Sequence, residues 1–115
     1  MKLLIAGSRD FQDYGKLCKT LDEFLSKNIV TEIVSGTARG ADRLGEQYAY
    51  ERNIKVARFP ANWDQYGKRA GYLRNVDMGN YCDCAIIFWD GVSKGTKHMI
   101  DILERLNKQY KVVIN

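Results

Sequence analysis

The strongest constraint on the fold is the alternation of short apolar runs with segments of helical periodicity. The apolar runs are short enough to be strands buried on both faces, which are typical of parallel sheets. The runs cover residues 3–6, 33–34, 56–59, 85–89 and 112–114. The segments between them place apolar residues three or four positions apart, as amphipathic helices do. These segments cover residues 14–25, 41–49, 70–81 and 95–106, with a polar loop expected over residues 61–68.

A chain that alternates strands and helices in this way predicts a parallel sheet with right-handed crossovers and helices on both faces. We expect an α/β fold, a minimal Rossmann-like three-layer sandwich. Its five-stranded parallel sheet has the predicted order 3-2-1-4-5. The 115 residues are enough for one such domain, so residues 1–115 are expected to form a single unit.

The segments that follow the predicted strands are the candidates for ligand binding. Parallel strands all end at one edge of the sheet, and ligands bind there, at the switch point between the first and fourth strands. Glycine lets a ligand approach the backbone, and a helix that begins at such a turn attracts phosphate groups. The predicted ligand-binding residues are Gly7, Ser8, Arg9, Ser35, Gly36, Thr37, Arg39, Gly40, Asp42, Trp63, Tyr66, Lys68, Gly91, Gly95 and Thr96.

Several of these residues have two interpretations. Trp63 and Tyr66 either stack on a nucleobase or cap the apolar edge of the sheet. Asp64 and Asp90 either accept a hydrogen bond from a ribose hydroxyl, hold a water or help to bind a metal, or they stabilise turns and helix caps. His98, the one histidine of the chain, is either a general base or a surface residue.

Composition excludes several other classes of protein. The net charge of +4 suits an anionic partner, but the basic residues form no dense run of the kind that binds nucleic acid. The longest apolar run, residues 85–89, is too short to cross a membrane. Three cysteines and no signal-peptide pattern favour the cytoplasm. No dinucleotide-binding G-x-G-x-x-G, no P-loop and no zinc ligand set occurs, so neither a cofactor nor a metal is predicted.

A set of motifs resembles one known family along almost the whole chain. The motifs are Gly7-Ser8-Arg9, residues 35–42, Asn62-Trp63-Asp64, residues 67–71, Arg74-Asn75-x-x-Met78 and Gly95-Thr96. They resemble the YspA-type proteins of the SLOG superfamily, which includes the DprA/SMF proteins and the LOG phosphoribohydrolases. The resemblance implies a Rossmann-like fold, a nucleotide or ADP-ribose-like ligand and a homo-oligomer, and it adds Asn75 to the ligand-binding residues.

The same resemblance bears on whether the ligand is cleaved. LOG enzymes carry a glutamate after a Gly-Thr pair, but Lys97, His98 and Met99 follow Gly95-Thr96 here. We therefore expect binding or sensing of a nucleotide or ADP-ribose-like ligand. The alternative is a hydrolase of N-glycosidic or phosphate bonds, with Arg74, Asp64 and Asp90 as catalytic residues. A second alternative is DprA-like binding of single-stranded nucleic acid.

Overall fold

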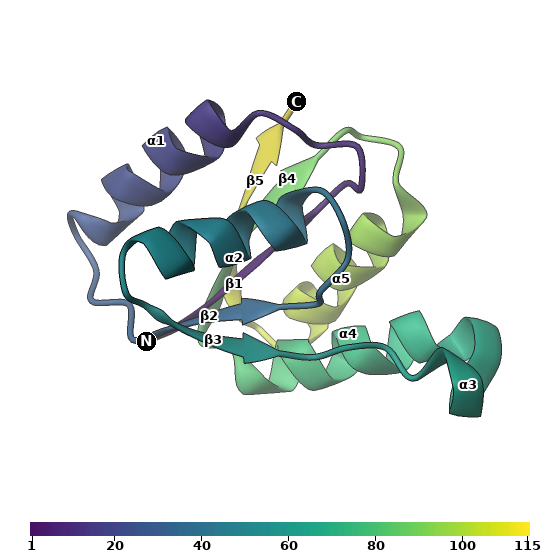
Figure 1. Cartoon of the computed structure of the whole chain (residues 1–115). Coiled ribbons are helices and arrows are strands. Elements are labelled where there is room, and N and C mark those ends of the chain that lie inside the picture. Colours follow the sequence, from purple (N-terminus) through teal and green to yellow (C-terminus); the bar gives the residue numbers. More distant parts are fainter.

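A parallel sheet with the strand order β3-β2-β1-β4-β5 forms the middle layer of the protein, as the computed structural model of residues 1–115 shows (Figure 1). All four pairs of neighbouring strands run parallel. The predicted fold class and strand order are thereby confirmed. The strands are β1 (Lys2–Gly7), β2 (Glu32–Ser35), β3 (Lys55–Arg58), β4 (Cys84–Trp89) and β5 (Gln109–Ile114).

Helices cover both faces of this sheet. The helices α1 and α2 lie on one face, and α4 and α5 lie on the other (Figure 1). None of these helices combines the length and the apolar composition that a membrane-spanning segment requires. The helices are α1 (Tyr14–Leu25), α2 (Ala41–Glu51), α3 (Trp63–Tyr66), a 3₁₀ turn (Gly67–Arg69), α4 (Ala70–Tyr81) and α5 (Lys94–Arg105).

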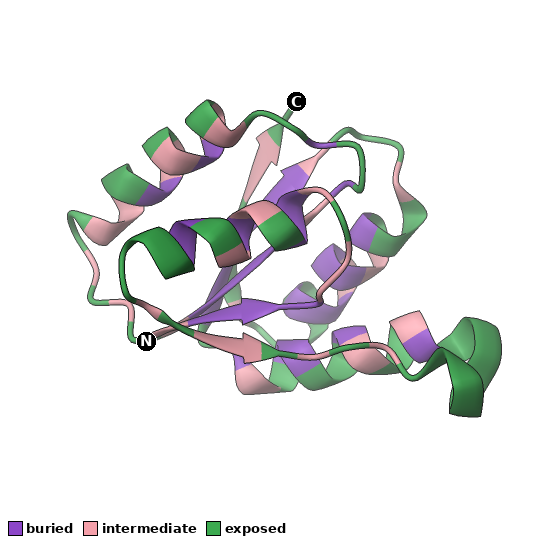
Figure 2. Cartoon of the chain, viewed as in Figure 1, coloured by how far each residue is buried: buried purple, intermediate pink, exposed green.

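Two apolar cores result from the alternation of side chains along the strands. On β1, Leu3 and Ile5 pack with α1 and α2, whereas Leu4 and Ala6 pack with α4 and α5. Figure 2 shows the middle of the sheet and the inner helix faces as buried. Burial on both faces explains why these strands appear in the sequence as continuous apolar runs.

The segment expected to be a loop, residues 61–68, instead contains α3 and part of the 3₁₀ turn, so that expectation was wrong. The side chain of Asn62 caps α3 by accepting a hydrogen bond from Gln65 N at 3.1 Å. No residue of α3 is buried, so the helix leaves no apolar periodicity in the sequence. Figure 2 shows α3 as an exposed projection from the body.

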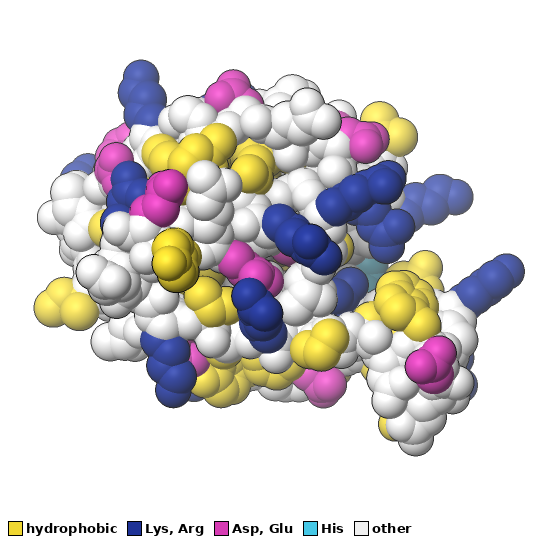
Figure 3. All heavy atoms as spheres, viewed as in Figure 1, with side chains coloured by type: hydrophobic (Ala, Val, Ile, Leu, Met, Phe, Trp, Pro, Cys, Tyr) yellow, Lys and Arg dark blue, Asp and Glu magenta, His cyan; other side chains and the backbone are white.

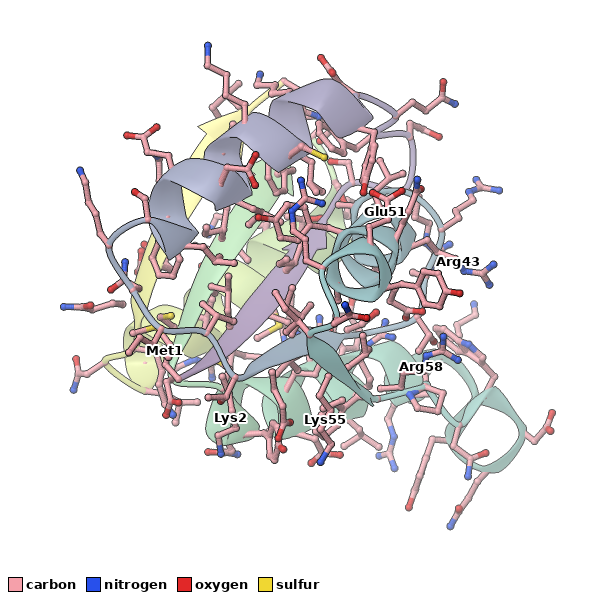
Figure 4. The ribbon with its side chains drawn as sticks, turned by 60° about the vertical axis from the view of Figure 1, so that its left-hand side comes forward. Met1, Lys2, Arg43, Glu51, Lys55 and Arg58 are labelled. Carbon is pink, nitrogen blue, oxygen red and sulfur yellow. The ribbon has the colours of Figure 1, made fainter.

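The strand ends define two opposite edges of the sheet. In Figure 4, Met1, Lys2 and Lys55 mark the edge where β1 and β3 begin. Arg58 at the end of β3 and Arg43 on α2 lie toward the opposite edge. The loops that follow β1, β2, β3 and β4 therefore meet at one edge, where the sequence predicts the ligand.

Candidate functional site

A cleft lies at the carboxyl edge of the sheet, around Arg9 and Arg74. It consists of three adjoining hollows, and both arginines line each of them. The loops after β1, β2, β3 and β4 bound this cleft, together with the short helix α3, the helix α4 and the start of α5. The largest hollow has a volume of about 500 Å³. This is within the range of small-molecule sites, roughly 300–1,000 Å³.

Internal hydrogen bonds hold the loop after β2 in a defined shape. Ser35 is buried, and its hydroxyl donates to Glu46 Oε2 at 2.6 Å while it accepts from Thr37 N at 3.1 Å. The carboxylate of Asp42 accepts from Ala38 N at 3.2 Å. Thr37 has a φ of +65°, a left-handed conformation that is unfavourable for a β-branched residue. The loop thus presents its backbone to the cleft in a strained and fixed conformation.

A close contact joins this loop to the loop after β1. Gly40 has a φ of +83°, and a Cβ atom placed there would come within 2.4 Å of Ser8 O. The backbone N–H of Ala41 donates to the same oxygen at 3.4 Å. The buried hydroxyl of Ser8 in turn accepts from Asp90 N at 3.1 Å. Ser8 and Gly40 therefore join the loops after β1, β2 and β4.

Arg74 is fixed within the cleft by two neighbours. Its Nη1 donates to the carbonyl oxygen of Gly36, and its Nε donates to Asn75 Oδ1 at 3.1 Å. Asn75 is buried, and its amide nitrogen donates to Gly95 O at 3.3 Å. Burial lowers the pKa of Arg74, and the carboxylate of Asp42 opposes that shift. The guanidinium stays charged because even a lowered arginine pKa lies far above neutrality.

The largest hollow of the cleft is strongly positive. Its lining includes four arginines and no carboxylate. Figure 3 shows dark blue Lys and Arg side chains gathered between the body of the protein and the projecting α3. The arginines are Arg9, Arg39, Arg43 and Arg74. Such a hollow is suited to an anion, because its charges repel one another until an anion neutralises them.

Asp42 is the one carboxylate that lines the cleft, in the hollow next to the arginine-lined one. Its side chain is buried, and burial raises its pKa to about 6. The N–H of Ala38 and the charge of Arg74 partly oppose this shift. Asp42 is therefore ionised at neutral pH but gains a proton under mildly acidic conditions.

The start of α5 closes the cleft on the side of β4. Ser93 caps this helix by accepting from Thr96 N at 3.4 Å. Asp90 Oδ1 accepts from Val92 N and Ser93 N, both at 2.8 Å, and these bonds lower its pKa. Gly95 lines two of the three hollows, and a Cβ atom placed there would meet nothing within 4 Å. The lack of a side chain at Gly95 therefore keeps this part of the cleft open.

The structure brings most of the predicted site residues to the cleft. Those that line it are Gly7, Arg9, Gly36, Thr37, Arg39, Asp42, Trp63, Lys68, Arg74, Asn75, Gly95 and Thr96. Ser8, Ser35 and Gly40 lie behind this lining, where they hold the loops. The predicted residues outside the lining are Asp64, Tyr66, Asp90 and Gly91. A role for these four in binding or catalysis stays a prediction.

Some residues of the cleft were not among the predicted ones. Arg43 and Ser93 are polar examples, and Ala38 lines two of the hollows. Arg43 lies in the first turn of α2, one residue after Asp42. This position next to a predicted ligand-binding residue is the feature from which the sequence could have predicted Arg43. No group of three or more His, Cys, Asp or Glu side chains is placed so that it could hold a metal ion.

Comparison with known proteins places the chain among its relatives. Residues 1–66 match the family described as YAcAr, the YspA, cpYpsA-related SLOG family. The Gene 61 protein of Mycobacterium phage D29 is 34% identical over 104 residues, which cover 84% of this chain and 83% of that protein.

A solved structure has a similar fold. DNA processing protein A (DprA) from Streptococcus pneumoniae superposes on 99% of this chain with a TM-score of 0.79 and 16% sequence identity. This chain spans 50% of the length of that DprA chain. The strand order, the matched motifs of the N-terminal half and the phage relative agree: the chain belongs to the YspA, cpYpsA-related SLOG family.

Proposed function

We propose that the cleft binds a phosphate-bearing ligand of the nucleotide class, such as a nucleotide or an ADP-ribose-like molecule. The observation that carries this proposal is the hollow of about 500 Å³ whose lining combines four arginines, no carboxylate and the indole of Trp63. The arginines match a phosphate group, and the indole matches a flat base. A nucleotide is the common class of metabolite that joins these two groups.

The arginines supply the phosphate site. A guanidinium binds phosphate through two parallel hydrogen bonds, which fixes the orientation of the ligand as well as its charge. Arg74 is already held by Gly36 and Asn75, so little side-chain freedom is lost when the ligand binds. Arg9 faces the same space from the loop after β1. We place the phosphate between these two side chains.

Trp63 supplies the site for the base. The residue is 50% exposed, and its ring lies over the start of α4, 3.3 Å from the point where a Cβ of Gly71 would be. Gly71 leaves room for the indole beside the cleft. Tyr66, three residues later on the same short helix, does not line the cleft. The two aromatic residues thus form a natural pair of test and control.

Calorimetric titration with ADP-ribose, AMP and ribose 5-phosphate tests this proposal. We expect binding of the two nucleotides in the natural chain. Trp63→Ala should weaken it by about 1–3 kcal/mol, which is the usual contribution of one stacked base. Tyr66→Ala should leave it unchanged, and binding of ribose 5-phosphate should not depend on Trp63. Absence of binding by every one of these ligands would refute the proposal.

Cleavage of the ligand is a second candidate, supported by the position of Asp42. A buried carboxylate with a raised pKa beside an arginine is typical of acid–base sites. Asp64 and Asp90, by contrast, lie outside the cleft lining, and Asp90 already accepts two backbone hydrogen bonds. Chromatography of AMP and ADP-ribose after incubation distinguishes cleavage from binding. Turnover that is lost in Asp42→Asn, with binding retained, would establish the hydrolase.

Nucleic-acid binding is supported only by the positive cleft and by the fold shared with DNA processing protein A. Such binding would weaken steeply as salt is added, because released counterions drive it. Titration of labelled single-stranded DNA at two salt concentrations tests this candidate. Self-association also stays a prediction, and sedimentation of the purified chain measures it.

A further inference from the structure

A second hollow, of about 470 Å³, lies on the other side of the start of α5 from the cleft. Aromatic and basic side chains dominate its lining, which comes from α4, the end of β4 and the first turns of α5. The residues that matter here are Tyr72, Trp89, Val92, Lys94 and His98. This space is separate from the three hollows of the cleft, and we call it the second hollow.

The aromatic rings of the second hollow are held in place by neighbours. Trp89 Nε1 donates to Ser93 O at 3.1 Å. The rings of Tyr72 and His98 meet edge to face, with centroids 4.5 Å apart. His98 Nδ1 lies 3.2 Å from the amide nitrogen of Asn75, the residue that also holds Arg74. Rings that are already fixed bind a flat ligand at a small entropic cost.

The second hollow adjoins the cleft at Tyr72. Tyr72 lines both spaces, and it is 52% exposed. Lys94 and Gly95 are consecutive residues at the start of α5, and Lys94 lines the second hollow while Gly95 lines the cleft. A ligand whose phosphates lie beside Gly95 therefore needs to pass only the first turn of α5 to enter the second hollow.

The charge of the second hollow also suits a phosphate-linked ligand. Lys94 lines the second hollow and contributes an ammonium group to it. Lys97 lies further along α5 and is paired with Asp101 at 2.5 Å, so its charge is already compensated. The uncompensated positive charge of the second hollow is therefore that of Lys94, which precedes the cleft residue Gly95 in the chain.

We propose that the second hollow receives the second ring of a two-part ligand, in which two nucleosides are joined through a pyrophosphate. One base would stack on Trp63, the phosphates would contact Arg9, Arg74 and Lys94, and the second base would lie against Tyr72 and Trp89. This inference rests on the proposed function, because it extends the same ligand from the cleft.

Two matched pairs of ligands test the inference by calorimetry. ADP carries one nucleoside and the two phosphates, whereas diadenosine diphosphate adds a second nucleoside; GDP and diguanosine diphosphate form a second pair. We expect the two-part ligand to bind roughly 5- to 150-fold more tightly than the matching single nucleotide, the gain of one further stacked base. The measured quantity is the ratio of the two dissociation constants.

Three variants locate that gain. Tyr72→Ala and Val92→Asp should both bring the ratio of dissociation constants close to one. Val92 is 79% exposed and lines only the second hollow, so its replacement should not disturb folding. Leu73→Ala is the control, because Leu73 is 40% exposed on the same helix and lines neither space. Using the ratio removes any general effect of a variant on phosphate binding.

The possible results separate this inference from the function on which it rests. A ratio near one in the natural chain, with ADP or GDP still bound, overturns the inference that the second hollow binds a second nucleoside. The proposed function then still stands. No binding of any of the four nucleotides overturns the inference, and if ADP-ribose and AMP also fail to bind, the proposed function falls with it. A ratio that Leu73→Ala lowers as much as Tyr72→Ala also overturns the inference. A dimer that Tyr72→Ala dissociates, with a ratio near one, assigns the hollow to a second copy of the chain instead.

Discussion

Arg74 on α4 donates a hydrogen bond from Nη1 to the carbonyl oxygen of Gly36, the residue that directly follows β2. The contact joins residues 38 positions apart. It also joins a helix that packs on one face of the sheet to a loop that leads into a helix on the other face. Arg74 therefore has two functions in the structure: it closes the cleft and it presents a charge to it.

Replacement of Arg74 by lysine keeps the positive charge but removes the planar guanidinium group. A lysine ammonium cannot hold Gly36 O, keep the bond to Asn75 and bind phosphate through two parallel bonds at once. We expect binding of ADP-ribose to Arg74→Lys to weaken at least about tenfold, or about 1.4 kcal/mol. Arg69→Lys is the control, since Arg69 is exposed and does not line the cleft. Equal affinity in the two variants would contradict the role given to the guanidinium.

Gly95 and Gly15 allow the open part of the cleft to be tested without changing the fold. Each is the second residue of its helix, α5 and α1 respectively, and neither has backbone within 4 Å of an added Cβ. Leucine at either position should leave the free energy of unfolding unchanged or raise it by up to about 1 kcal/mol, because glycine is unfavourable in helices. Only Gly95→Leu fills the cleft, so only this variant should lose nucleotide binding.

The measurements for this pair are denaturant unfolding and calorimetry. If Gly15→Leu lost affinity as well, the effect would come from the helices rather than from the cleft. If Gly95→Leu bound nucleotide normally, the ligand would have to lie away from the start of α5.

The buried carboxylate of Asp42 predicts a distinct pH dependence of stability. Its pKa rises from 3.8 to about 6 on folding, so the folded state binds the proton more tightly than the unfolded state does. The stability that this proton contributes is present below about pH 4 and is lost as the pH rises through about 6. The loss corresponds to about 3 kcal/mol at about 1.4 kcal/mol per pKa unit.

The variant Asp42→Asn removes this titration while its amide oxygen can still accept from Ala38 N. We expect the natural chain to lose stability relative to Asp42→Asn between about pH 4 and pH 7. Asp83, Asp90 and Glu51 have lowered pKa values and shift stability in the opposite direction, but they are present in both proteins. Their contributions cancel in the difference between the two unfolding curves. A difference in unfolding free energy that does not vary with pH would contradict a raised pKa for the buried carboxylate of Asp42.

Gly40 and Gly91 differ in how closely neighbouring loops approach them. Their φ values are +83° and +84°, yet a Cβ at Gly40 would come within 2.4 Å of Ser8 O, whereas one at Gly91 would meet nothing within 4 Å. Both alanine variants carry the cost of a positive φ, about 1–3 kcal/mol, and the ψ of −132° at Gly40 lies outside the left-handed helical region that other residues tolerate, so the backbone cost is greater there. Gly40→Ala should be destabilised clearly more than Gly91→Ala in denaturant unfolding, because it also forces the loops after β1 and β2 apart.

Much of the fold was predictable because its signals are local. The runs around Ile5 and Ile87 are apolar without interruption, which identifies strands buried on both faces. Their alternation with helical periodicity leads to the parallel sheet and its carboxyl edge. The helix α3 was missed because none of its residues is buried, so its only local signal was the cap at Asn62.

The sequence by itself determined the layers, the strand order and the edge of the sheet at which ligand-binding residues gather. These features were predictable because burial patterns and turns depend on residues that are close together in the sequence. Only the tertiary structure decided how those residues divide between structural and binding positions. Ser8, Ser35 and Gly40 hold loops behind the cleft, whereas Arg9 and Trp63 line it. The physical reason is that this division depends on contacts between segments far apart in the chain, such as Arg74 with Gly36, which no local pattern encodes.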